Sequence, residues 1–301
     1  MPVSKKPRKK PARKVQQTTN TIAALPDRRA MESFLASIAG RPRDEVIAKA
    51  QDVMYEAWEQ TTARARIARA HKALAISPLC ADAYNLLAEH TASLNEARDL
   101  YAKGVEAGEL ALGPEGFEEY ADQFWGFLET RPYMRARAGL AATLLQLGDA
   151  NAAASHYTEM LQLNPNDNQG VRYELAAILL RQDKETELKA LLAAYEDEFS
   201  TQWLYTRALL AFREGSAVET RAAALVKEAW SANEHVPAIL AGIKRAVASN
   251  SSYITMGGAD EASCYAADFG PAWRGTPGAI EWLTRFTATL QPKRRSNPVS
   301  R

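Results

Sequence analysis

The chain has 301 residues, of which 47% are hydrophobic and 24% charged, and its formal net charge is +1. This apolar content is enough for a packed core, but no run approaches the roughly 18 apolar residues that a membrane-spanning helix needs. No apolar stretch follows the N-terminus closely enough to form a secretory signal. The two cysteines, Cys80 and Cys264, make neither a disulfide framework nor a metal-binding pattern. We therefore expect a cytoplasmic protein without a membrane span.

The small net charge hides an uneven distribution. Seven of the 37 basic residues lie in residues 1–14, which contain no acid, and this leaves 30 basic against 36 acidic residues in the remainder. The prolines, lysines and polar residues up to position 25 predict a disordered basic tail, and residues 291–301 predict a second flexible basic tail. The first tail can bind phosphates without sequence specificity, but it has no aromatic residue to stack on bases.

The clearest structural unit is Met134–Asp167, which is 34 residues long. Gly148 and Asp149 break it into two helical segments, and Asn164-Pro165 ends it because proline cannot continue a helix. The segments place small and large residues at helical spacing: Leu140, Ala141, Leu144, Ala153, Tyr157 and Met160. This unit resembles the tetratricopeptide repeat, a 34-residue helix–turn–helix.

Related units are predicted near 47–80, 81–111, 168–199 and 200–234. A divergent helix at 114–131 interrupts the series, and its aromatic stripe is typical of a core. With a first helix near 27–40, these units make residues 26–248 a repeat domain. We expect an all-α fold, a right-handed solenoid of tetratricopeptide-like helical hairpins.

Residues 249–290 predict a non-repeat helical cap that closes the fold at its C-terminal end. Its two helices are expected in ADEASCYAADFG and PGAIEWLTRFTATL. Thr276 is the expected N-cap of the second helix, with Pro277 in the first turn. Gly270-Pro271 is expected to be a loop between the two.

A narrower resemblance rests on segments that occur in a fixed order from residue 79 onward. They are CADAYNLLAEHT, FWGFLETRPYMRARAGLA, LNPNDNQGVRY, WLYTRALLAFREG, HVPAILAG and GADEASCYAADFGPAWRGTPGAIEWL. As a set they resemble a bacterial group that is similar to the suppressor of tumorigenicity (ST-seven-like) tetratricopeptide family, over roughly residues 70–285. The resemblance implies a helical repeat scaffold and nothing catalytic, because that family has no agreed biochemical activity.

Residues that could carry chemistry do not combine into a catalytic or metal site. The four histidines lie in different units without metal-ligand spacing: His71, His90, His156 and His235. Acidic neighbours would raise the pKa of Cys264, and no histidine base can be assigned to it. We therefore expect no enzymatic activity, no metal and no cofactor.

A strip of polar residues at the unit junctions is the candidate binding site. First helices of successive repeats line one face of a solenoid, so equivalent positions form a continuous surface. Arg, Asn, Gln and Tyr side chains there suit an extended peptide, particularly an acidic or carboxylate-bearing one. The candidates are Asn85, Arg131, Arg135, Asn168, Gln169, Arg172, Tyr173, Tyr205 and Arg207. The alternative is that these residues cap helices and bridge repeats.

The leading interpretation is a protein–protein interaction scaffold that binds a peptide segment on the concave face of the repeat array. The alternative function is a nucleic-acid-associated adaptor, tethered by the basic N-terminal arm. Recognition of chaperone C-termini is not supported, because Gln51 stands where the carboxylate clamp of such repeats has an asparagine.

Overall fold

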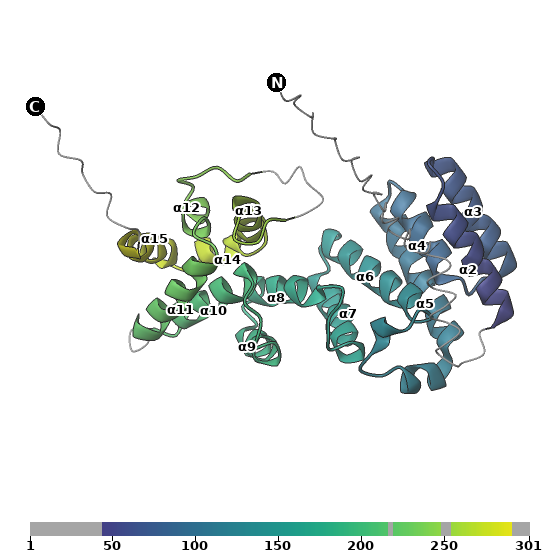
Figure 1. Cartoon of the computed structure of the whole chain (residues 1–301), viewed down its shortest axis with the longest axis horizontal. Coiled ribbons are helices and arrows are strands. Elements are labelled where there is room, and N and C mark those ends of the chain that lie inside the picture. The colour runs from purple at the N-terminus through teal and green to yellow at the C-terminus, as the bar shows by residue number, and fades with distance from the viewer. Residues whose placement is uncertain (1–43, 216–218, 248–253, 291–301) are drawn as a thin grey trace, which may run out of the picture. The chain divides into compact units, whose positions relative to one another are not determined.

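The computed structural model describes residues 44–215, 219–247 and 254–290. Within these ranges every secondary-structure element is helical and none is a strand (Figure 1), which confirms the all-α prediction for this part of the chain. None of the helices in these ranges is long and apolar enough to cross a bilayer. The tails predicted at 1–25 and 291–301 and the helix predicted near 27–40 lie outside the described residues.

From α2 to α11 the helices follow one another in pairs, and each helix packs against the next along the chain. The first helices also contact one another, α2 with α4 and α4 with α6. These pairs lie where the helical hairpins are predicted, while the domain boundaries themselves stay a prediction. The pairs are α2 (Glu45–Trp58) with α3 (Ala63–Ile76), α4 (Ala81–His90) with α5 (Leu94–Glu119), α6 (Arg131–Gln146) with α7 (Ala150–Leu163), α8 (Val171–Arg181) with α9 (Glu185–Ala194), and α10 (Thr201–Arg213) with α11 (Glu219–Ala232).

The turn between α6 and α7 shows how the local sequence ends one helix and starts the next. Gly148 has φ +90°, a left-handed conformation that glycine adopts without a Cβ clash. The Asp149 side chain then caps α7 by accepting a hydrogen bond from the Ala152 backbone N–H at 3.0 Å. Ala141 and Ala153 are fully buried on the two helices, which pack closely because these side chains are small. The predicted break at Gly148-Asp149 is confirmed.

The segment after α5 differs from the prediction. α5 kinks at Gly113, where φ is +62°, and it ends at Glu119, so the helix predicted at 114–131 is wrong beyond that residue. The chain then passes through Asp122, with φ +64°, and a short 3-10 helix, η1 (Phe124–Gly126). Pro132 lies in the first turn of α6 instead of ending a helix, because the N–H that proline lacks has no helical partner there.

Buried side chains hold this irregular segment in place. The Thr130 hydroxyl lies within hydrogen-bonding distance of the carbonyl oxygens of Phe124 and Phe127, the latter at 2.9 Å. The aromatic residues that were expected on one helical stripe instead form a cluster of tilted and edge-on rings. Their centroid separations are 5.1 Å for Phe117–Phe124, 5.3 Å for Phe117–Tyr133 and 4.4 Å for Tyr120–Phe127.

The C-terminal residues form α12 (Val236–Leu240), α13 (Ala259–Asp268), α14 (Gly270–Gly275) and α15 (Ala279–Leu290). α13 and α15 confirm the two predicted cap helices. The prediction of a loop at Gly270-Pro271 is wrong, because these residues open α14, whose first turn tolerates proline. Thr276 is the C-cap of α14 and not the N-cap of α15. The left-handed Gly278, with φ +76°, separates the two helices.

These C-terminal helices cover one side of α10. α13 contacts α10, α14 contacts α8, and α15 contacts α11. Tyr265 of α13 is fully buried with its ring centroid 5.6 Å from that of Tyr205 on α10. The Trp273 indole N–H donates to the Tyr265 hydroxyl at 2.8 Å. The side of α10 that carries Tyr205 is therefore core.

Candidate functional site

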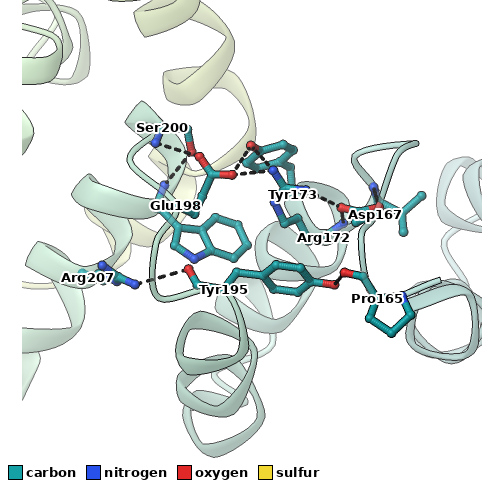
Figure 2. A network of polar contacts seen from close by, with 10 residues as sticks. Pro165, Asp167, Arg172, Tyr173, Tyr195, Glu198, Ser200 and Arg207 are labelled. Atoms are coloured by element: carbon teal, nitrogen blue, oxygen red, sulfur yellow. Dashed lines mark hydrogen bonds and ion pairs between the residues drawn. The ribbon is translucent and has the colours of Figure 1, made fainter. Parts of the chain in front are cut away.

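Arg172, in the first turn of α8, is at the centre of a polar cluster with Asp167, Tyr173 and Glu198 (Figure 2). The Asp167 carboxylate accepts hydrogen bonds from the backbone N–H groups of Val171 at 2.8 Å and Arg172 at 3.0 Å. Its Oδ2 atom also pairs with Arg172 Nη1 at 3.0 Å. Asp167 thus binds the N-terminal end of α8, where a negative charge is favourable, and balances the guanidinium charge.

Glu198 connects α8 to the start of α10. Arg172 Nη2 and the Tyr173 hydroxyl both donate to Glu198 Oε2, the hydroxyl at 2.8 Å, and the Ser200 backbone N–H donates to Oε1 at 2.9 Å. Burial alone would raise the pKa of Glu198, but these hydrogen bonds outweigh it and hold the pKa below its ordinary value. The cluster is therefore a charged bridge between successive helix pairs.

Three aromatic rings surround the Arg172 guanidinium. Its Cζ atom lies 4.5 Å from the ring centroid of Tyr173, 5.3 Å from that of Tyr195 and 6.0 Å from that of Trp203. The Tyr195 hydroxyl in turn donates to the Pro165 carbonyl at 2.9 Å. Only 16% of the Arg172 side chain is exposed, so its hydrogen bonds are largely made within the protein.

A second polar cluster joins α2, α4 and α6 around Asp82, whose side chain is fully buried. Arg135 of α6 binds both carboxylate oxygens, from Nε at 2.9 Å and from Nη2 at 2.5 Å. The Gln51 amide donates to Oδ2 at 2.8 Å and the Asn85 amide to Oδ1 at 3.2 Å. The Arg135 guanidinium also lies 5.7 Å from the Trp58 ring centroid. In contrast to Arg172, Arg135 keeps 29% of its side chain exposed.

Two other predicted arginines bind backbone carbonyl groups. Arg131 Nε donates to the Trp125 carbonyl at 3.0 Å, and its guanidinium lies 5.6 Å from the Trp125 ring centroid. Arg207 Nη2 donates to the carbonyls of Glu196 at 2.9 Å and Leu192 at 3.2 Å. Arg207 thus supplies donors and positive charge at the C-terminal end of α9, where helix carbonyls lack partners.

The remaining predicted residues lie in different surroundings. Asn168 is exposed and its side-chain amide pairs with that of Asn164, whereas Gln169 is half-buried. Tyr205 is fully buried, and its hydroxyl donates to the Asn233 carbonyl at 2.7 Å. The expectation that Tyr205 lines an open peptide groove is wrong, because the C-terminal helices cover it.

The structure therefore brings four of the nine predicted residues into two clusters, Asn85 and Arg135 around Asp82, and Arg172 and Tyr173 with Asp167 and Glu198. Within both clusters the contacts bridge neighbouring helix pairs, and peptide binding by these residues stays a prediction. The sequence reasoning missed the carboxylates that the arginines bind. A usable signal was present only for Asp167, an acidic residue that ends one unit five residues before Arg172.

The other reactive groups of the described residues are the two cysteines and the side chains that could bind a metal. Burial, reinforced by the nearby Asp82, raises the pKa of Cys80 to about 12. Partial burial and neighbouring acids, Asp268 first among them, also raise the pKa of Cys264. Both cysteines are thus held as thiols, the unreactive form. No group of three or more metal-ligating side chains comes together in the described ranges. The expectation that the protein is not an enzyme stays a prediction.

Comparison with known proteins gives a family match and several animal relatives. Residues 42–124 match the model of a family described as ST7 protein. The chain is 28% identical over 253 residues to the Suppressor of tumorigenicity 7 protein-like of Rattus norvegicus. The aligned region covers 77% of this chain and 45% of the rat protein. It is 26% identical over 257 residues to the Protein ST7 homolog of Drosophila melanogaster, and the alignment covers 77% of this chain and 47% of the fly protein. It is 27% identical over 281 residues to the Suppressor of tumorigenicity 7 protein of Macaca fascicularis, and the alignment covers 78% of this chain and 52% of the macaque protein.

The chain spans about half the length of these relatives. The similarity agrees with the resemblance to the suppressor of tumorigenicity family that the sequence segments indicate. The relatives named here are animal proteins, so they do not test the predicted bacterial grouping, and their names do not mention tetratricopeptide repeats or an activity.

Proposed function

We propose that this chain is a protein-interaction scaffold of the suppressor of tumorigenicity 7 type, built from tetratricopeptide-like hairpins stacked as a right-handed solenoid. The consecutive packing of helix pairs and the contacts between the first helices α2, α4 and α6 support this arrangement. Stacked repeats of this kind offer one extended surface to a partner, because equivalent helix faces line up along the stack.

The proposed binding surface is the side formed by the first helices α2, α4, α6 and α8. The observation that carries it is the position of Arg135. Buried Asp82 holds the guanidinium with two hydrogen bonds, while 29% of the Arg135 side chain stays exposed. A charged group that is already fixed loses little conformational freedom when a partner binds, which favours affinity.

The paired charges also change the expected ligand. An acidic peptide would have to compete with Asp82 for Arg135, and with Asp167 and Glu198 for Arg172. A largely neutral polar segment, which contacts the exposed edge of Arg135 and leaves its ion pair intact, therefore fits this surface better. Arg172 is assigned to bridging and not to the partner. The nucleic-acid alternative concerns the N-terminal arm, outside the described residues, and stays a prediction.

Site-specific photo-crosslinking tests this proposal. A benzophenone amino acid is placed at Glu89 of α4 or Glu174 of α8, which are exposed positions on first helices. The matched controls carry it at Lys72 of α3 or Lys103 of α5, which are exposed positions on second helices. Irradiation in extracts of the source organism should crosslink the same partner from the two first-helix positions and not from the controls. Equal crosslinking from all four positions, or crosslinking from the controls alone, would contradict the proposed surface.

A further inference from the structure

A trough of about 860 Å³ lies between the second helices α7 and α9. Its floor includes Leu175 and Leu179 of α8, which lie one helical turn apart and are almost fully buried. Small side chains line the two walls, and this keeps the helices from filling the space between them. They are Ala154, Ser155 and Thr158 on α7 and Ala190 and Ala194 on α9. The trough is therefore apolar at its base and open along its length.

Hydrogen bonds close the trough at both ends. At one end the Asn151 side-chain carbonyl accepts from Gln182 Nε2 at 3.2 Å and from Lys184 Nζ at 3.1 Å. At the other end the Tyr195 hydroxyl donates to the Pro165 carbonyl at 2.9 Å, a contact that Figure 2 shows. The starts of α7 and α9 thus lie together, as do their ends. The two helices run parallel and bound a trough of defined length.

The length of the trough fits a short helix. Asn151 and Gln162 both line the α7 wall, and at about 1.5 Å per residue the distance between them along α7 is about 16 Å, or three helical turns. A helix of that length presents one apolar stripe at spacings of three and four residues. Insertion of such a stripe between two helices is an established mode of peptide recognition. An elongated open trough suits it better than it suits a compact small molecule.

Charge indicates what kind of helix would bind. Glu159 on α7 and Glu187 on α9 place one carboxylate on each wall. Glu159 shares its charge with Arg137, and Glu187 is exposed. The cation among the lining residues is Lys184, which binds Asn151 at one end. A partner would therefore meet carboxylates on both flanks of its apolar stripe.

We infer that this trough binds a three-turn amphipathic helix of another protein, with leucine-like anchors and Lys or Arg residues on both flanks. The walls of the trough are second helices, and its lining residues include neither Arg135 nor the first-helix crosslinking positions, so either proposal can fail without the other. Binding would place two or three anchors over Leu175 and Leu179, while the flanking cations pair with Glu159 and Glu187.

Designed peptides provide the probe. A fluorescently labelled peptide of leucines at helical spacing with lysines at all other positions is compared with one that has glutamates in place of the lysines. Fluorescence anisotropy at physiological ionic strength should show binding of the lysine peptide, with a gain in helicity by circular dichroism because so short a helix is marginal alone. The glutamate peptide should bind at least about fivefold more weakly. Its glutamates would repel Glu159 and Glu187 at the two flanks, where the lysines of the other peptide attract them.

Variants of α9 locate the binding. The double variant Ala190→Gln, Ala194→Gln fills the trough and should weaken binding of the lysine peptide at least about tenfold, as overpacking of an apolar site does. Ala193→Gln is the matched control, because Ala193 is exposed on α9 but lines a different hollow. Glu187→Lys should weaken binding about two- to fivefold. Glu196→Lys makes the same charge change at an exposed position that does not line the trough, and it should leave binding unchanged.

Several outcomes would overturn the inference. Equal binding of both peptides would remove the charge argument, and equal losses in the trough variants and their controls would move the binding elsewhere. Sedimentation of the protein alone identifies another occupant: self-association that the double variant abolishes would show that a second copy fills the trough. If circular dichroism shows that the double variant is unfolded, the comparison of Glu187→Lys with Glu196→Lys decides whether the peptide binds in the trough.

Discussion

Removal of the Arg135 side chain would leave the Asp82 carboxylate buried between α2, α4 and α6 without its counter-charge. Asp82 is fully buried, and Arg135 supplies two of the hydrogen bonds that its carboxylate accepts, while Gln51 and Asn85 supply one each. Loss of one partner from a buried ion pair costs about 3–5 kcal/mol. Because two amide donors remain on the carboxylate, we expect Arg135→Ala to lower the free energy of unfolding by about 3 kcal/mol.

A double-mutant cycle separates the charge effect from lost packing. Asp82→Asn removes the buried charge with little change of shape, so Arg135→Ala, Asp82→Asn should be more stable than Arg135→Ala alone by about 1–3 kcal/mol. Arg98→Ala is the control, because the Arg98–Asp99 pair has side chains that are 41% and 59% exposed, and such pairs contribute about 0–1 kcal/mol. Urea unfolding followed by circular dichroism gives each free energy, provided that the slope with urea stays constant.

The prediction is wrong if Arg135→Ala lowers the free energy of unfolding no more than the Arg98→Ala control. It is also wrong if the double variant is no more stable than Arg135→Ala, since the uncompensated charge of Asp82 would then not be the source of the lost stability. The predicted cost has a practical consequence for the proposed function. Arg135→Ala is unsuitable as a binding variant, because any lost interaction could result from a weakened fold, and this is why the crosslinking positions avoid the pair.

Two further predictions concern packing and pH. Gly139→Ala should lower the free energy of unfolding by about 1–3 kcal/mol, because the new Cβ would lie 2.2 Å from a Tyr101 ring carbon. Gly275→Ala is the control and should leave stability unchanged, because its Cβ would meet nothing within 4 Å. Urea unfolding compares the two variants, and equal losses would show that the contact with Tyr101 is not the cause. Burial and the nearby Arg137 cation lower the pKa of His156 below its ordinary value of 6.5, and Arg137 Nε donates to His156 Nδ1 at 3.2 Å. The unfolded chain therefore binds this proton more readily, so the stabilisation is present above about pH 6.5 and is lost as the pH falls through the folded pKa. Urea unfolding of His156→Gln should show a smaller loss between about pH 7 and pH 5 than the parent, and identical pH profiles would show that His156 is not responsible.

The helix pairs could be predicted because residues close in sequence determine where each helix begins and ends. Gly148 and Asp149 form a turn and a cap regardless of what packs around them, and Ala141 and Ala153 mark a close approach through size alone. The segment after α5 could not be predicted in the same way. Its aromatic spacing is compatible with a helix, but the buried Thr130 hydroxyl and the packed rings stabilise a different backbone, and tertiary contacts override local preference.

The candidate site could likewise be predicted only in part. Arginines at the unit starts are visible in the sequence, but their partners come from other units. Asp82 and Arg135 are on different helix pairs, and Glu198 lies at the far end of the unit that Arg172 begins. With 36 acidic residues in the chain, no local rule selects these two. The same side-chain types serve as peptide ligands or as bridges between repeats, and only the three-dimensional position of a carboxylate distinguishes the two roles.

The C-terminal helices limit how far a partner can extend along the first-helix side. α13 covers Tyr205 on α10, so the proposed surface ends near α8. A partner segment on this side is therefore expected to lie along α2, α4, α6 and α8 and to stop short of α10.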